Sequence, residues 1–169
     1  MKHYGSQVDG TFCEHTVSYV DHITPIPDAL DSAQAAGIMC AGFTAYSALK
    51  QSEAHIGNWV AIPGAGGGLG HLGQLVNTLN LIYPYLKCVY CLSRRAIAMG
   101  LRVVAIDTGE GKRKLCLELG AEKWIDFRES TDLVAEVIAA TKGGVHAAIV
   151  ISGGVRACEQ AWSYLRRRG

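Results

Sequence analysis

A short apolar run that ends in a cluster of glycines places the strongest constraint on this chain. Residues 58–73 read NWVAIPGAGGGLGHLG, with five glycines between positions 64 and 70. An apolar run of this length is typical of a buried β-strand, and the glycines let the backbone turn tightly and approach a ligand closely. A helix that starts after such a turn presents free N–H groups and the positive end of its dipole, which suits a pyrophosphate.

The spacing of these glycines departs from the strict G-x-G-x-x-G fingerprint. Ala65, Gly67 and Gly70 fit it with alanine in the first place, or else Gly64 serves with one extra residue. A glycine-rich turn that binds nothing is the alternative. The candidate phosphate loop consists of Gly64, Ala65, Gly66, Gly67, Gly68, Leu69 and Gly70.

Apolar runs and helical patterns alternate along the rest of the chain. The runs cover residues 58–64, 100–109, 122–127 and 145–154, and the helical patterns cover 110–121, 130–144 and 155–169. Apolar runs bounded by turn residues are typical of parallel strands that are covered on both faces. The alternation therefore predicts an α/β fold, a Rossmann-type doubly wound parallel sheet.

Capping residues indicate where several helices begin and end. Ser130 or Thr131 is the expected N-cap of the 130–144 helix, which should stop at Gly143. Before the first strand, one helix is expected from Asp28 or Asp31 and a second over residues 42–51. The C-terminal helix is expected to align five residues on one face: Val155, Cys158, Ala161, Trp162 and Leu165.

An acid at the end of the second strand would complete a dinucleotide site. Asp107 ends the run RVVAID, where a carboxylate binds the adenosine ribose and favours NAD by repelling a 2′-phosphate. Asp107 follows Gly67 by 40 residues, about twice the usual spacing of roughly 20. The spacing is restored if residues 76–94 interrupt the helix after the loop, as translated non-coding sequence would. Cys88 and Cys91 lie in that segment and are expected to carry no chemistry.

Length, charge and composition argue against a nucleic-acid-binding, secreted or membrane protein. The 169 residues suffice for one ordinary core, and a net charge of +1 gives no electrostatic footprint for nucleic acid. The sequence starts without a signal-peptide pattern and holds no apolar run of the roughly 18 residues that a membrane helix needs. Six scattered cysteines suit a reducing compartment. We therefore expect a cytoplasmic protein with no nucleic-acid or membrane partner.

Four segments together resemble a known family. CAGFTAYSALK, GNWVAIPGAGGGLGHLG, AMGLRVVAIDTGEGKRKLCLELGAEKWIDF and GGVHAAIVIS are similar to the zinc-dependent alcohol dehydrogenases of the medium-chain dehydrogenase/reductase superfamily, specifically the fungal NAD-linked group. The resemblance runs from about Asp9 to the C-terminus, except over residues 76–94. It implies an oxidoreductase that uses NAD and zinc to transfer a hydride between an alcohol and an aldehyde or ketone at a zinc-bound oxygen. It also implies a small-molecule alcohol or aldehyde substrate and a homo-oligomer.

The resemblance assigns roles to individual residues. Cys40 matches the third protein ligand of the catalytic zinc, and Thr44 matches a catalytic-site residue beside the nicotinamide. The glycine loop matches the pyrophosphate site, Asp107 the ribose-binding acid and Lys112 a lysine beside the adenosine ribose.

The departures from the family matter as well. A first zinc cysteine, a Gly-His-Glu segment and a four-cysteine zinc lobe, which the family places upstream of Cys40, are not found in this sequence. We expect residues 1–27 to be a remnant of a β-rich, GroES-like catalytic domain, and residues 28–169 to be an NAD-binding domain truncated at its C-terminal end. Two alternatives stay open: a catalytically inactive NAD-binding fragment, and a zinc-independent relative of the quinone reductases.

Overall fold

The computed structural model describes residues 7–28, 32–68, 96–97 and 99–167. In chain order the elements are η1 (Val20–His22), α1 (Ser32–Gly37), η2 (Ile38–Gly42), α2 (Phe43–Gln51), β1 (Trp59–Pro63), β2 (Arg102–Asp107), α5 (Glu110–Glu118), β3 (Lys123–Asp126), α6 (Leu133–Thr141), β4 (Ala147–Ala148) and α7 (Val155–Tyr164).

The four strands form one parallel sheet in the order β3-β2-β1-β4. Every residue of β1 is buried, as are the last five residues of β2. These strands are apolar on both sides because helices cover both faces of the sheet. The predicted doubly wound α/β fold is confirmed.

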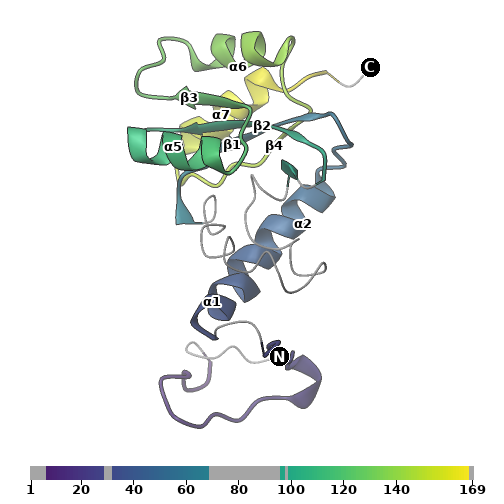
Figure 1. Ribbon diagram of the computed structural model, residues 1–169, viewed down its shortest axis with the longest axis vertical. Coiled ribbons are helices and arrows are strands. Elements are labelled where there is room, and N and C mark those ends of the chain that lie inside the picture. Colours follow the sequence, from purple (N-terminus) through teal and green to yellow (C-terminus); the bar gives the residue numbers. More distant parts are fainter. Residues whose placement is uncertain (1–6, 29–31, 69–95, 98, 168–169) are drawn as a thin grey trace.

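Side chains alternate along the central strands and build two cores. On one face, residues of β1 and β2 pack with α2 and α5; on the other, they pack with α6 and α7 (Figure 1). The first core holds Leu49, Val60, Ile62, Val103, Ala105 and Cys116 among others, and the second holds Trp59, Ala61, Val104, Ile106, Val137 and Tyr164 among others. The sheet therefore has a fixed register, since a slip of one residue would exchange the two cores.

Two helices precede β1, as predicted. The second, expected over residues 42–51, is α2, and α1 begins at Ser32 in the described residues. The sequence did not predict that the π-helical turn η2 joins them without a break from Ser32 to Gln51. Gly42, expected to start the second helix, has an ordinary right-handed helical conformation. Figure 1 shows this helical rod extending away from the sheet, with residues 7–28 at its far end. In that segment the 3-10 turn η1 is the one named element, and the predicted domain boundary after residue 27 stays a prediction.

The start of α6 corrects a prediction. Its N-cap is Asp132, not Ser130 or Thr131, and the Asp132 carboxylate accepts a hydrogen bond from the backbone N–H of Ala135 at 3.0 Å. Ser130, Thr131 and Asp132 can all cap a helix. Asp132 is the one that directly precedes Leu133, the first residue of the helix, which is buried. At the other end Lys142, with φ 54°, takes the left-handed position one residue before the expected stop.

The orientation of α7 corrects another. Ala161 and Tyr164 face the core, whereas Val155, Cys158 and Trp162 are exposed. The expected single apolar face is therefore wrong: Ala161 and Tyr164 lie one turn apart on the inner side, and the other three share the outer side.

Residues 76–94, with Cys88 and Cys91, lie outside the described residues, so the interruption hypothesis stays a prediction. Over the ranges that the structure describes, no helix is both long and apolar enough to cross a membrane.

His146 joins the start of β1 to the segment that leads into β4. Its ring atom Nδ1 accepts a hydrogen bond from the backbone N–H of Trp59 at 2.9 Å, and the backbone N–H of His146 donates to the Trp59 carbonyl at 2.8 Å. Burial, and then the charge of Arg166, lower the pKa of His146 below its ordinary value of 6.5. The neutral ring is the form that the fold needs, because a protonated Nδ1 cannot accept a hydrogen bond.

We expect this contact to make stability depend on pH. The folded-state pKa lies below the unfolded value, so His146 contributes fully above pH 6.5 and loses its contribution as the pH falls through the folded-state pKa. The lost hydrogen bond is worth about 1 kcal/mol. Urea denaturation between about pH 5 and pH 8 should show this loss in the native chain. A His146→Asn variant, whose amide oxygen accepts without titrating, should lack it; identical profiles for the two chains would contradict the assignment.

Candidate functional site

The candidate site centres on Asp107, the last residue of β2. Asp107 is only 5% exposed. Its Oδ2 accepts a hydrogen bond from the backbone N–H of Gly66 at 2.9 Å, and its Oδ1 accepts from the N–H of Thr108 and from Lys112 Nζ, both at 2.8 Å. The sequence predictions for Gly66, Asp107 and Lys112 therefore converge on one place, since this carboxylate links the glycine turn after β1 to the helix after β2.

The turn after β1 requires glycine at its first position. Gly64 has φ +89°, a region that other residues rarely adopt. A Cβ atom built there would lie 3.0 Å from the backbone nitrogen of Ser152 and 3.2 Å from Ile151 Cγ1. The N–H of Gly64 donates to the carbonyl of Ile106 at 2.8 Å, which fastens the turn to the end of β2.

Four successive N–H groups of the loop have acceptors inside the protein. Those of Gly64 and Ala65 donate to Ile106, that of Gly66 to Asp107, and that of Gly67 to the Gly64 carbonyl. These residues shape the turn and leave no free donor for an anion. A phosphate would have to be met by N–H groups from Gly68 onward. Leu69 and Gly70, also predicted to bind the cofactor, lie outside the described residues.

Lys112 crosses over the glycine turn. A Cβ atom at Gly66 would come within 2.6–2.7 Å of the Cβ, Cγ and Cδ atoms of Lys112, so the lysine stem lies directly on the glycine backbone. The Lys112 side chain is 46% exposed, whereas that of Asp107 is 7% exposed. The ammonium group can therefore move toward a ligand while the carboxylate stays in place.

Asp126 is a site residue that the sequence analysis missed. It ends β3, in register with Asp107, and its carboxylate accepts from the N–H groups of Gly109 and Arg128 at 3.1 and 2.9 Å. Burial raises the pKa of Asp126, but these bonds and one from the Thr108 hydroxyl outweigh it and lower the pKa below its ordinary value. Asp126 thereby holds the turn between Asp107 and α5. The sequence feature that could have predicted this role is an acid near the end of the third apolar run, residues 122–127.

Cys40 and Thr44 form a separate pair on the helical rod. Cys40 lies in the π-helical turn η2, and the Thr44 hydroxyl donates to its carbonyl at 2.9 Å. Both residues are exposed. π-Helical turns are rare and often mark functional positions, which agrees with the expected role of this segment without testing it.

The described donor set does not fit a catalytic zinc. Such a site takes three protein ligands, and no group of three or more His, Cys, Asp or Glu residues that could hold a metal is found in the described part of the chain. Cys40 thus belongs to no such group among these residues.

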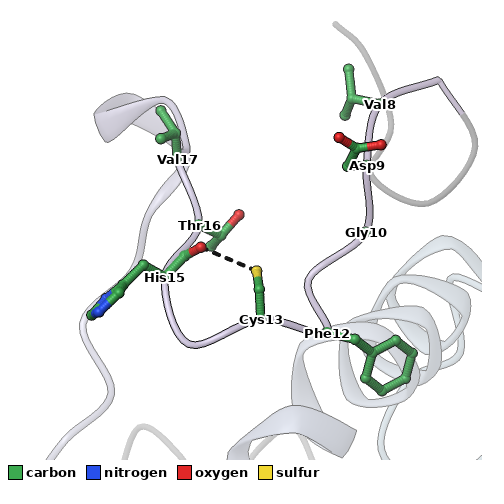
Figure 2. Close-up of a pocket in the computed structure, with 8 residues that line it drawn as sticks. All are labelled: Val8, Asp9, Gly10, Phe12, Cys13, His15, Thr16 and Val17. Carbon is green, nitrogen blue, oxygen red and sulfur yellow. Dashed lines mark hydrogen bonds between the residues drawn. The ribbon is translucent and has the colours of Figure 1, made fainter.

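A hollow in the N-terminal segment gathers Asp9, Cys13 and His15 with other residues (Figure 2). The Cys13 thiol donates to the carbonyl of His15 at 3.1 Å. The His15 ring points away from Cys13 (Figure 2). These groups do not converge on a common point, so the hollow adds no candidate metal site.

Comparison with known proteins places the chain in a family. The model for the zinc-binding dehydrogenases matches residues 91–169. An alcohol dehydrogenase of Schizosaccharomyces pombe is 43% identical over 162 residues, and alcohol dehydrogenase 1 of Emericella nidulans is 41% identical over 167. The chain belongs to the zinc-type alcohol dehydrogenase family. The two matches extend over 96% and 98% of this dehydrogenase-like chain. The chain itself spans only 41% and 42% of the length of these two relatives.

Solved structures agree with this placement. An alcohol dehydrogenase from the archaeon Aeropyrum pernix superposes with a TM-score of 0.76 at 28% identity, over 99% of this chain and 44% of that one. An Escherichia coli quinone oxidoreductase in complex with NADPH reaches a TM-score of 0.69 at 25% identity, over 86% of this chain and 39% of that one. The fold of this chain is therefore shared by an alcohol dehydrogenase and by a quinone oxidoreductase.

Proposed function

We propose that this chain binds NAD at the carboxyl ends of β1 and β2, as the nucleotide-binding part of an oxidoreductase of the alcohol dehydrogenase type. The observation that carries the proposal is the buried carboxylate of Asp107, bonded at once to the glycine turn and to Lys112. An acid at this position accepts hydrogen bonds from the hydroxyls of an adenosine ribose.

The residues of the proposed site contact different parts of NAD. Asp107 orients the ribose. Lys112, whose stem lies across Gly66, contacts the solvent-facing side of the same ribose. The glycine-loop motif from Gly68 onward is proposed to meet the pyrophosphate with backbone N–H groups. Bound NAD supplies a nicotinamide ring that accepts or donates a hydride. Thr44 is proposed to lie beside that ring, on the strength of the family resemblance.

The reaction proposed for the whole protein is the interconversion of an alcohol with an aldehyde or ketone, in the cytoplasm. It rests on the curated relatives, which are named alcohol dehydrogenases. The donors in the described part of the chain do not form a zinc site. For this chain alone we expect NAD binding without alcohol turnover.

Cofactor titration tests the proposal. Tryptophan fluorescence and calorimetry should show NADH binding to the full chain at least about tenfold more tightly than NADPH, because a 2′-phosphate beside Asp107 is repelled and cannot replace the ribose hydroxyl as a donor. Absence of NADH binding would refute the proposal. A preference for NADPH would favour the zinc-independent, quinone reductase-like alternative, which the structural similarity to quinone oxidoreductases keeps open.

A turnover assay distinguishes an inactive NAD-binding chain from an active alcohol dehydrogenase. The chain is mixed with NAD, ethanol and added zinc, and NADH formation is followed by absorbance. A rate equal to the blank is the expected result, and turnover above the blank would show that the chain is an active alcohol dehydrogenase by itself.

A further inference from the structure

The turn after β2 donates hydrogen bonds to two different carboxylates. Asp126 ends β3 in register with Asp107 at the end of β2, so both acids lie at the same edge of the sheet. The Thr108 N–H donates to Asp107 at 2.8 Å. The Thr108 hydroxyl donates to Asp126 instead, and so does the Gly109 N–H, at 3.1 Å. Thr108 therefore joins the proposed ribose acid to its neighbour on β3.

We propose, on the basis of the NAD site proposed above, that Asp126 is a second specificity-determining residue, which acts together with Asp107 to select NAD over NADP. Asp107 would act by accepting from the ribose hydroxyls. Asp126 would act without touching the ribose, through the donors that it occupies and the charge that it carries.

The occupied donors are the first part of this selection. A phosphate on the 2′-hydroxyl extends past Asp107, toward the backbone that follows β2. The donors that it would meet there are the Thr108 hydroxyl and the N–H of Gly109, an exposed residue. Both already donate to Asp126. Hydrogen bonds to a carboxylate are about twice as strong as those between neutral groups, so a phosphate could gain these donors only at a large cost.

The charges around the turn are the second part. Burial raises the pKa of Asp126, but its hydrogen bonds outweigh burial and lower the pKa below its ordinary value, so the acid is ionised at neutral pH. A hollow beside the turn is lined by four acids and two arginines, among other residues: Glu110, Asp126, Glu129, Glu136, Arg113 and Arg128. A phosphate with about two negative charges is repelled by this excess of acids.

The nearest cations already have acidic partners. Lys112 Nζ lies 2.8 Å from Asp107 Oδ1, and Arg113 lies 3.4 Å from Glu110. A 2′-phosphate would have to draw these side chains away from their carboxylates. Donors, acids and cations of this turn therefore all favour the cofactor without the phosphate.

Titration of the full chain with NADH and with NADPH tests the proposal. The deciding quantity is the NADPH dissociation constant divided by that of NADH. A merely structural change would alter both constants alike, because the two cofactors differ only in the 2′-phosphate. Asp126→Asn should lower this ratio by about tenfold. The negative charge is lost, and the new amide nitrogen can donate to the phosphate.

Two further variants support the measurement. Asp126→Ser removes the charge and shortens the side chain, which frees Thr108 and Gly109 to donate, so the ratio should fall at least as far. Asp132→Asn is the matched control: it makes the same change at the exposed N-cap of α6 and should leave the ratio unchanged. Circular dichroism and urea denaturation verify that each variant is folded.

A double variant separates the two acids. If Asp107 were the sole determinant, Asp107→Asn would remove the whole preference, and a second change at Asp126 would add nothing. We expect the ratio of D107N/D126N to lie below that of Asp107→Asn. Salt gives an independent measurement: between about 0.05 M and about 0.5 M, screening should lower the ratio more in the native chain than in Asp126→Asn.

Two results would overturn the proposal, and they differ in what else they refute. If Asp126→Asn and Asp126→Ser fold, bind NADH and keep the native ratio, Asp126 has no part in selection and the NAD site stands. If the native chain binds neither cofactor, the proposed function fails and the role of Asp126 fails with it.

Discussion

Replacing Asp107 with asparagine is expected to weaken NADH binding by about 10- to 100-fold. Asparagine keeps the size of the side chain and an oxygen that can accept from Gly66, so the glycine turn should survive. The amide nitrogen then takes the place of Oδ1 and cannot accept, so the negative charge, the ion pair to Lys112 and the hydrogen bond from the Thr108 N–H are lost. A hydrogen bond from a ribose hydroxyl to a carboxylate contributes about 1.5–3 kcal/mol, which corresponds to that range. Calorimetric titration with NADH measures the change.

The same chemical change at Asp132 provides the control. Asp132 is an exposed N-cap on α6, and asparagine caps a helix about as well as aspartate does. Asp132→Asn should therefore leave NADH affinity unchanged. The Asp107→Asn variant should also discriminate less against NADPH, since repulsion of the 2′-phosphate is removed. Native affinity in Asp107→Asn would show that this carboxylate does not bind the ribose.

The sheet and the centre of the candidate site could be predicted from sequence because both depend on local patterns. Continuous apolar runs at 58–64 and 100–109 could hardly be other than strands buried on both faces. The ends of such strands meet at one edge of a parallel sheet, which brings Asp107 to the glycine turn although 41 residues separate it from Gly66.

Some features depend on which of several neighbouring residues is buried or hydrogen-bonded in the folded chain, and local sequence patterns do not predict them. The apolar residues of α7 are numerous enough to suggest one broad face, but within the helix Ala161 and Tyr164 are buried, and Leu165 at its end packs partly against the same core. Likewise, composition shows that the loop is rich in glycine but not that the N–H groups of Gly64 to Gly67 are used internally. That result follows from a long-range contact with the end of β2.

The assignment of Cys40 illustrates a second limit. A metal site is defined by several donors that meet in space, and a single cysteine in the sequence carries no information about the others. The structure puts Cys40 on the helical rod, with no set of ligands around it in the described residues. Its role therefore rests on the family resemblance, and the NAD site rests on contacts that can be measured.

Replacing Gly64 with alanine is expected to lower the free energy of unfolding by about 2–4 kcal/mol. The strain of a non-glycine residue at φ +89° contributes about 1–3 kcal/mol. The new methyl group would press on the backbone nitrogen of Ser152 at 3.0 Å and on Ile151 at 3.2 Å, and overpacking of this kind adds about 1–3 kcal/mol, partly relieved by relaxation. Urea denaturation followed by circular dichroism measures the loss.

Gly68→Ala is the matched control, because it makes the same substitution four residues later in the same loop. A Cβ atom at Gly68 meets no heavy atom of the described residues within 4 Å, and the backbone there is not in the positive-φ region. Alanine is also the better helix former at this helix start, by up to about 1 kcal/mol. Gly68→Ala should therefore be as stable as the native chain or slightly more so. Equal losses in the two variants would mean that strain at Gly64 is not what the turn depends on, whereas a loss confined to Gly64→Ala would show that the shape of this turn requires glycine.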